Sequence, residues 1–312
     1  MKQYGFGVDV GGTTIKMGLF HTDGALIEKW EIVTRTEDGG AMVLPDIARA
    51  IDEKMKQKGI SHDEVQGVGI GVPGPVKADG MVIGCVNLGW GIFNVEEELS
   101  KLTGLKVKAG NDANVAALGE MWMGGGKGCR DMIMVTLGTG VGGGIIVNGK
   151  VVNGANGAGG EIGHFTVNPD EIEPCNCGQF GCLEQYCSAT GVVRMAKRKL
   201  LKSAAPSTLR FREDISSKLV FDEAKAGDAL SAEVVEELGR ILGSTLSNIS
   251  VVTNPEVIVI GGGVSRAGKV LIDVIQKHFL ESCFHACRST RFELAQLGND
   301  AGIYGGVHMI LD

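Results

Sequence analysis

Apolar residues form short runs along the chain, separated by turns and by amphipathic stretches. Residues 4–20, YGFGVDVGGTTIKMGLF, contain two such runs around a glycine–threonine turn, and this pattern predicts a β-hairpin. MIMVTLGTGVGGGIIVNG, which starts at Met132, repeats the outline. The repetition indicates a weak internal duplication, with one hairpin opening each half of the molecule.

Helical and extended patterns alternate around these two hairpins. A stretch with helical spacing ends at Gly59, a residue type that commonly terminates helices. We expect strands at 65–72 and near 81–86, and helices at 44–58, 232–249 and 269–279. This alternation predicts α/β domains with largely buried sheets.

Composition limits the classes of function that fit. The chain has 312 residues, 44% of them hydrophobic and 21% charged, which suits two soluble domains. A net charge of −7 gives no basic surface, so we do not expect a nucleic-acid partner. No run is typical of an export signal or a membrane span, and we therefore expect a cytoplasmic protein with no membrane partner.

Glycine-rich turns are the first candidates for chemistry. The segment from Gly138 to Gly143 has the spacing G-x-G-x-x-G, but a strand pattern follows it where a dinucleotide-binding fingerprint needs a helix. The chain contains no G-x-x-x-x-G-K-[ST] loop either. Each hairpin turn alone is explained as well by a simple tight turn as by a phosphate-binding turn. The pair, with Asp9 as a possible Mg²⁺ partner, predicts a clamp for a triphosphate.

Cysteines are concentrated in CNCGQFGCLEQYC, residues 175–187, which holds four of the eight. In a reducing compartment such clustering favours a metal site over disulfides. Four N/S ligands of the kind that close a tetrahedral Zn²⁺ site are present: His164, Cys175, Cys177 and Cys182. Cys187 is an alternative fourth ligand, and a set of reduced buried thiols is the alternative to metal. We expect the remaining cysteines, Cys85, Cys129, Cys283 and Cys287, to be unpaired thiols.

Five motifs, VDVGGTTIKMGLF, NDANVAALGE, LGTGVGGG, GEIGH and CNCGQFGCLE, occur in this order over most of the chain. Together they resemble the ROK family of sugar kinases and repressors, and GVPGPV and VNLGW resemble its glucokinase branch. The resemblance implies a two-domain α/β fold of the actin-like ATPase (ribonuclease H-like) class with an interdomain cleft. We expect a smaller domain from residues 1–111 plus 299–312, and a larger one from 112–298 that carries the zinc site.

The resemblance also implies a site for ATP and Mg²⁺ built from three glycine-containing turns. The first phosphate motif is Asp9, Gly11, Gly12, Thr13, Thr14 and Lys16; the second is Gly138, Thr139 and Gly140; the adenosine-side turn is Gly261, Gly262 and Gly263. Asp112 is implied as the catalytic base, and Asn111, Glu161, His164 and Glu184 as ligands of sugar hydroxyls. GEIGH before the cysteine cluster favours His164 over Cys187 as the fourth zinc ligand.

Phosphoryl transfer to an alcohol requires one well-placed carboxylate, and Asp112 would accept the proton of the 6-hydroxyl of a hexose. Local sequence alone favours another role, because either Asn111 or Asp112 is a good helix N-cap. The two roles are compatible, and a helix amino terminus favours the ionised carboxylate. Glu161 and Glu184 flank the metal ligands, so zinc would order the sugar site.

The resulting hypothesis is ATP-dependent phosphorylation of glucose, a reaction of glycolysis, by a homo-oligomer (dimer or tetramer). The main alternative is a ROK kinase for mannose, fructose or N-acetylmannosamine, which sequence separates poorly from glucose. A non-catalytic zinc-containing sugar sensor is disfavoured because Asp112 and the phosphate turns are present. A DNA-binding repressor is disfavoured because only eight residues precede Asp9.

Overall fold

The computed structural model describes residues 2–311, which divide into two compact units. Of these residues, unit 1 takes 2–128, 144–160 and 296–311, and unit 2 consists of Cys129–Gly143 and Glu161–Ala295. Helix α4 (Asp112–Met123) belongs to unit 1 because it packs on α10 (Ala301–Leu311). This division by packing differs from the expected boundary at Asp112. Within residues 2–311, no helix combines the length and hydrophobicity that crossing a bilayer requires.

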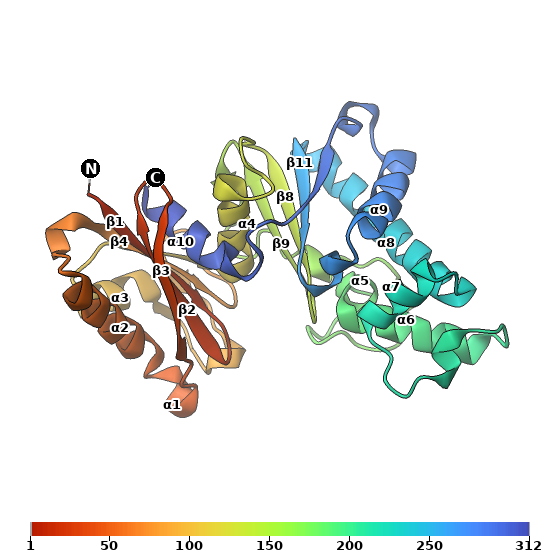
Figure 1. The fold of residues 1–312 in the computed structure, drawn as a ribbon, viewed down its shortest axis with the longest axis horizontal. Helices are drawn as coiled ribbons and strands as arrows, with labels where there is room; N and C mark the ends of the chain where they lie inside the picture. Colours follow the sequence, from red (N-terminus) through yellow and green to blue (C-terminus); the bar gives the residue numbers. More distant parts are fainter. Residues whose placement is uncertain (1, 312) are drawn as a thin grey trace. The chain divides into compact units, whose positions relative to one another are not determined.

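Unit 1 is built on a sheet with the strand order β3-β2-β1-β4-β7 (Figure 1). Strand β2 runs antiparallel to both β1 and β3, whereas β4 and β7 continue the sheet in parallel from β1. The strands are β1 (Tyr4–Val10), β2 (Thr14–His21), β3 (Leu26–Val33), β4 (Val65–Val72) and β7 (Val107–Asn111). The predicted first hairpin and the predicted strand at 65–72 are therefore confirmed.

Two pairs of helices cover the two faces of this sheet. Side chains of successive strand residues alternate between the faces: Phe6 joins the core cluster with α2 and α3, whereas a Cβ at Gly7 would meet α10. Helix α2 (Val43–Lys58) ends at Gly59 in the left-handed conformation, as predicted, and α3 is Val95–Thr103. The short elements of this unit are α1 (Glu37–Gly40), β5 (Met81–Val82) and β6 (Phe93–Asn94).

The predicted strand near 81–86 is wrong beyond Val82. Gly84 has a φ of +136°, a conformation that does not continue a strand. The chain instead forms a 3₁₀ helix at Val86–Leu88, which ends at Gly89 in the left-handed region. The glycines on either side of the short helix thus explain the interruption.

Glycine permits the close packing of α10 in unit 1. A Cβ added at Gly69 of β4 would lie 1.7 Å from the Gly306 carbonyl oxygen, and one at Gly305 would lie 1.7 Å from the Val115 carbonyl oxygen. Real Cβ atoms cannot approach backbone this closely. Helix α10 therefore lies directly against the sheet on one side and against α4 on the other, because small residues line both contacts.

A second sheet has the order β10-β9-β8-β11-β12, and the division between the units falls within β9 after Gly143. Its strands are β8 (Met132–Leu137), β9 (Val141–Val147), β10 (Lys150–Val151), β11 (Val257–Gly261) and β12 (Arg291–Leu294). The predicted second hairpin corresponds to β8 and β9. Strand β11 runs parallel to both β8 and β12.

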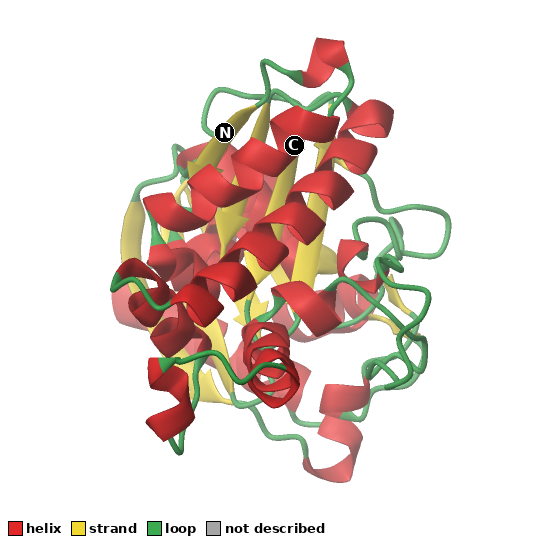
Figure 2. Cartoon of the chain, turned by 90° about the vertical axis from the view of Figure 1, so that its right-hand side faces the viewer, coloured by secondary structure: helices red, strands yellow, loops and turns green. Residues whose placement is uncertain are grey.

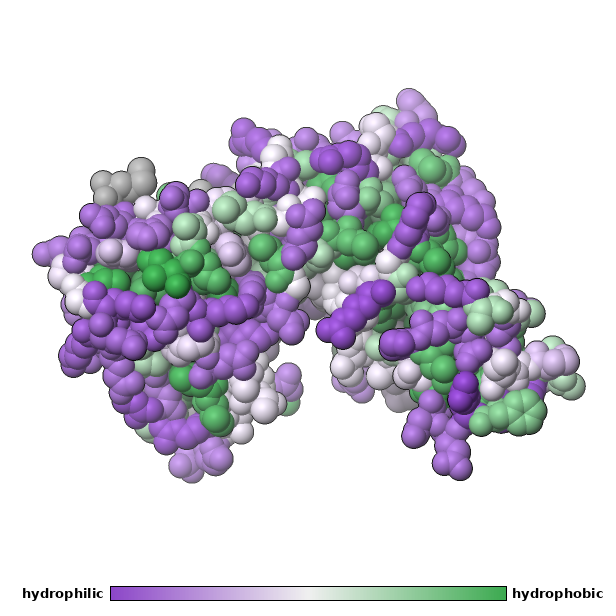
Figure 3. Space-filling view, viewed as in Figure 1, coloured by the Kyte–Doolittle hydropathy of each residue, from purple (hydrophilic) through white to green (hydrophobic). Residues whose placement is uncertain are grey.

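Helices cover the sheet of unit 2, and Figure 2 shows long helices in front of its strands. They are α5 (Glu184–Cys187), α6 (Ala189–Lys202), α7 (Ser217–Lys225), α8 (Ala229–Thr253) and α9 (Lys269–Ser282). Helix α8 begins earlier than predicted because the Asp228 side chain accepts a hydrogen bond from Ser231 N and caps it. Hydrophilic residues cover most of the face drawn in Figure 3, in keeping with the composition.

Candidate active site

Parallel strands bring the first phosphate motif and the expected base to one edge of the sheet in unit 1. In the strand register, Asp9 of β1 is opposite Gly71 of β4, and Gly71 is opposite Gly110 of β7. The next residues along β7 and into α4 are Asn111 and Asp112. Because the carboxyl ends of parallel strands meet at one edge, Asp9 and Asp112 lie at the same edge.

Asp9 is a confined carboxylate. It lies opposite Lys16 across the β1–β2 pair, and a Cβ at Gly302 would come within 2.6 Å of its Cγ. Burial raises the pKa of Asp9, and the positive charge of Lys16 partly opposes this effect. A nearby divalent cation would favour the ionised form further, which fits the Mg²⁺ partner expected here.

Two hydrogen bonds, each accepted by one of the turn's own carbonyl oxygens, hold the glycine turn that follows Asp9. Gly11 N donates to the Thr14 carbonyl oxygen at 3.0 Å, and Thr34 Oγ1 donates to the Gly11 carbonyl oxygen at 2.7 Å. A Cβ at Gly12 would meet no described atom within 4 Å, so open space adjoins the turn. This geometry fits a turn that receives phosphate oxygens.

Asn111, and not Asp112, caps helix α4. The Asn111 Oδ1 accepts from Asn114 N at 3.1 Å, and its Nδ2 donates to the Gly74 carbonyl oxygen at 3.1 Å. Asp112 is the first helical residue, and its Oδ1 accepts from Ala113 N at 2.8 Å. Capping therefore does not account for the carboxylate at position 112.

In unit 2, the second phosphate turn and the expected adenosine-side turn are neighbours. Strands β8 and β11 are parallel, with Gly261 opposite Thr136, so residues 138–140 and 261–263 follow the same sheet edge. Gly262 has a φ of +83°, and a Cβ there would lie 2.5 Å from the Leu137 carbonyl oxygen. Only glycine fits this close, left-handed position.

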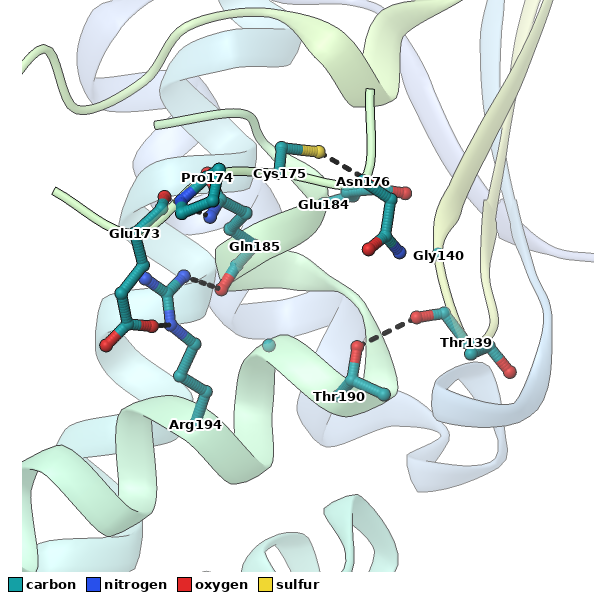
Figure 4. A pocket seen from close by; sticks show the side chains of 11 residues that line it. Thr139, Gly140, Glu173, Pro174, Cys175, Asn176, Glu184, Gln185, Thr190 and Arg194 are labelled. Carbon is teal, nitrogen blue, oxygen red and sulfur yellow. Dashed lines mark hydrogen bonds and ion pairs between the residues drawn. The ribbon is translucent and has the colours of Figure 1, made fainter. Parts of the chain in front are cut away.

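Glu184 connects the second phosphate turn with the cysteine cluster (Figure 4). Its Oε1 accepts from Cys175 Sγ at 3.0 Å, and its Oε2 accepts from Val141 N at 3.4 Å. A Cβ at Gly140 would lie 2.5 Å from Oε2. A pocket of about 240 Å³ lies beside these groups, and Thr190, which also lines it, donates to the Thr139 carbonyl oxygen at 2.9 Å.

The four predicted zinc ligands lie together. The ligand atoms of His164, Cys175, Cys177 and Cys182 are all within 4.8 Å of one another. The Sγ atoms of Cys177 and Cys182 are 3.7 Å apart, and Cys175 Sγ is 4.0 Å from His164 Nδ1. A tetrahedral zinc with Zn–S bonds of about 2.3 Å needs ligand separations of about 3.8 Å, so the set fits this metal.

Cys187 lies outside this group. It is fully buried in α5, and its Sγ faces the Leu238 carbonyl oxygen of α8 at 3.9 Å. All eight cysteines are free of disulfides, including the four expected to be unpaired. The geometry thus favours His164 as the fourth ligand.

The expected sugar ligands are distributed over both units. Asn111 belongs to unit 1, while Glu161, His164 and Glu184 belong to unit 2. Glu161 immediately precedes the 3₁₀ helix Ile162–His164, and both Glu161 and His164 are exposed. Cys175 contacts both His164 and Glu184, so the structure brings these two sugar candidates close to the metal cluster.

Glu120 and Glu171 are among the buried carboxylates that the sequence analysis did not consider. Glu120 of α4 is fully buried and accepts from the backbone N–H groups of Gly125, Gln296 and Leu297. Glu171 is held by Arg198, whose hydrogen bonds lower the pKa of Glu171 well below its ordinary range. The sequence carried one signal for Glu120, namely a charged residue within the apolar pattern of α4.

Comparison with known proteins places the chain among sugar kinases. A family model described as ROK family matches residues 5–312. A glucokinase of Halalkalibacterium halodurans is 45% identical over 306 residues, which cover 96% of this chain and 92% of that protein.

Solved structures agree. A ROK family glucokinase from Streptomyces griseus, in complex with glucose and AMPPNP, has a TM-score of 0.75 and 32% identity, covering 98% of each chain. A ROK hexokinase from Thermus thermophilus has a TM-score of 0.78 and 29% identity, covering 97% of this chain and 96% of its own. The expected fold class, the two-domain actin-like ATPase fold, is confirmed.

Proposed function

The chain belongs to the ROK family, and from this membership and its site residues we propose that it transfers the γ-phosphoryl group of ATP to the 6-hydroxyl of glucose. The glucokinase relative at 45% identity over 96% of the chain supports glucose as the acceptor. The assignment makes the protein an ATP:hexose 6-phosphotransferase.

One observation carries the proposal: Asp9 and Asp112 end up at the same edge of a parallel sheet in unit 1. Phosphoryl transfer depends mainly on positioning and charge stabilisation and needs a single base. Asn111 caps α4, so the cap does not depend on Asp112, and we assign to Asp112 the role of accepting the proton of the sugar hydroxyl. The amino terminus of α4 favours its ionised form.

The glycine turns hold the nucleotide. Backbone N–H groups and threonine hydroxyls around Gly11–Thr14 and Gly138–Gly140 bind phosphate oxygens, and the turn at Gly261–Gly263 lies on the adenosine side. Lys16 adds a positive charge next to Asp9. Mg²⁺ bound near Asp9 would neutralise charge on the transferring group.

The sugar hydroxyls are held by Asn111, Glu161, His164 and Glu184. A structural Zn²⁺ bound by His164, Cys175, Cys177 and Cys182 supports this role, because Glu184 lies only two residues after the ligand Cys182. Zinc would bind Cys175 as a thiolate, so it would order Glu184 through the backbone rather than through the thiol hydrogen bond. The free thiols of all eight cysteines suit a reducing compartment, which supports the cytoplasm as the site of action.

A hexose panel with ATP and Mg²⁺, read as kcat/KM for phosphate transfer, tests the proposal. We expect glucose to exceed mannose, fructose and N-acetylmannosamine by at least about tenfold, a margin that one or two hydrogen bonds supply. A tenfold preference for another sugar would refute glucose as the substrate but retain the kinase. No transfer to any hexose would refute the kinase assignment itself.

A further inference from the structure

Besides the metal ligands, a buried ion cluster anchors the segment that leads to Cys175. The side chain of Glu171 is only 1% exposed. Arg198 of α6 donates to it twice, from Nη1 to Oε2 at 2.7 Å and from Nη2 to Oε1 at 3.0 Å. Tyr186 of α5 donates its hydroxyl to Oε2 at 2.6 Å. One carboxylate thus connects the segment with both helices.

Arg194, one turn before Arg198 on α6, extends this cluster. Its Nη2 lies 2.7 Å from Glu171 Oε2 as an ion pair but makes no aligned hydrogen bond among the described residues. Its Nε donates to Glu173 Oε2 at 2.9 Å, and its Nη1 to the Gln185 carbonyl oxygen at 3.3 Å (Figure 4). The guanidinium therefore joins the segment to the start of α5.

Gln185 completes the connection to the metal ligands. Its Nε2 donates to the Glu173 carbonyl oxygen at 2.9 Å, and its Oε1 accepts from Cys182 N at 3.0 Å. Figure 4 shows Glu173, Arg194 and Gln185 on one side of the pocket that Cys175 and Glu184 also line. Through Gln185 and Arg194, the segment before Cys175 and the backbone of Cys182 are both connected to α6.

We propose that Glu171, Tyr186, Arg194 and Arg198, here called the Glu171 clamp, form a positioning device that sets Cys175 and Glu184 in place for metal and sugar. This inference rests on the proposed function for the role of Glu184. The clamp grips the chain on both sides of the site: Glu171 and Glu173 precede Cys175, and Gln185 and Tyr186 follow Glu184. Zinc would then bind a loop whose cysteines are already arranged.

The chemistry of the clamp suits positioning better than simple stabilisation. Buried ion pairs contribute little net stability relative to well-packed apolar residues, but their directional bonds define one geometry. A bidentate arginine–carboxylate pair fixes both distance and orientation. A rigid helix of 14 residues, α6, supplies both arginines.

Glu171→Gln tests the clamp, with Glu233→Gln as the matched control, because Glu233 pairs with Lys199 of the same helix from an exposed position on α8. Outer-sphere partners typically alter metal affinity or activity about 10-fold to 100-fold. We therefore expect Glu171→Gln to raise the KM for glucose about tenfold, with the KM for ATP and kcat nearly unchanged. Zinc release from loaded protein to excess chelator should be about tenfold faster.

Two outcomes would overturn the clamp. One is a variant with a lower melting temperature but wild-type glucose KM and zinc release, which would make Glu171 purely structural. The other is an equal effect in Glu233→Gln. If Glu171→Gln does not fold, Tyr186→Phe removes the hydrogen bond to Glu171, together with the one that the hydroxyl accepts from Asn168 Nδ2, and should show the same changes at about threefold. If the wild type phosphorylates no hexose, the proposed function fails, yet the zinc-release comparison still decides on the clamp.

Discussion

Replacing Asp112 with asparagine separates the chemistry at this position from its structural role. In the structure Asn111 provides the helix cap, through its bond from Asn114 N, while Asp112 occupies the first turn of α4. The amide of Asp112→Asn keeps the size of the side chain and an oxygen that can accept from Ala113 N, as Oδ1 does at 2.8 Å. It cannot accept a proton at neutral pH.

The expected magnitudes follow from these roles. Loss of a general base lowers turnover about 10²-fold to 10⁴-fold, equivalent to about 2.7–5.4 kcal/mol of barrier. Loss of a negative charge at a helix amino terminus costs about 0.3–1 kcal/mol of stability. Asn111→Ala should instead lose the cap and the bond to the Gly74 carbonyl oxygen, about 2 kcal/mol together.

A coupled phosphorylation assay, glucose titration calorimetry and urea unfolding distinguish the two variants. Asp112→Asn should bind glucose with a Kd within about threefold of wild type while its kcat falls at least about a hundredfold. If it retained more than about a tenth of wild-type turnover, the base would lie elsewhere. A loss of stability equal to that of Asn111→Ala would show that Asp112 acts as the cap.

Three further predictions concern the metal, the packing and the acid stability. Cys187→Ser should leave zinc content by metal analysis unchanged, whereas Cys177→Ser should lose it; zinc lost from Cys187→Ser would place Cys187 among the ligands. Gly305→Ala should lower the free energy of unfolding in urea by about 1–3 kcal/mol, because its Cβ would clash with α4. Gly91→Ala, with open space around the added carbon, is its control, and equal losses would refute the packing argument. Burial acts to raise the pKa of Asp228, but hydrogen bonds from Ser231 and Thr208 outweigh it and lower the pKa from 3.8 to about 2. The stability that ionised Asp228 contributes is thus present above about pH 4 and is lost as the pH falls to about 2. Asp228→Asn should therefore reduce the change of the urea unfolding midpoint with pH over this range, and an unchanged dependence on pH would contradict this.

Sequence patterns predicted those elements whose signals are local. Helix α2 ends at Gly59 as expected, because the left-handed cap is written into one residue. The strand near 81–86 failed because apolar residues such as Val86 also occur on surface turns; that side chain is 97% exposed. Composition does not distinguish these environments, since exposure depends on what packs above the residue.

The same distinction, between local signals and those that depend on the fold, applies to the candidate site. The grouping of the four predicted zinc ligands was predictable because a metal needs particular atoms in a narrow spacing, and the ligand atoms lie within 4.8 Å of one another in the structure. The choice between Asn111 and Asp112 as cap was not, because both side chains suit that position. The Glu171 clamp was also missed, since Glu171 and Arg198 lie 27 positions apart and only the fold pairs them.

The position of α10 has a consequence for the order in which the protein is made. This helix packs directly on β1 and β4, yet its residues 301–311 are translated after all of unit 2. Domains usually fold from the amino terminus onward as they leave the ribosome. Here we expect the reverse, because unit 2 is complete in sequence while the sheet surface around Gly69 still lacks its covering helix. A ribosome that stalled shortly before residue 301 would carry an unfinished first unit with that apolar face open to chaperones.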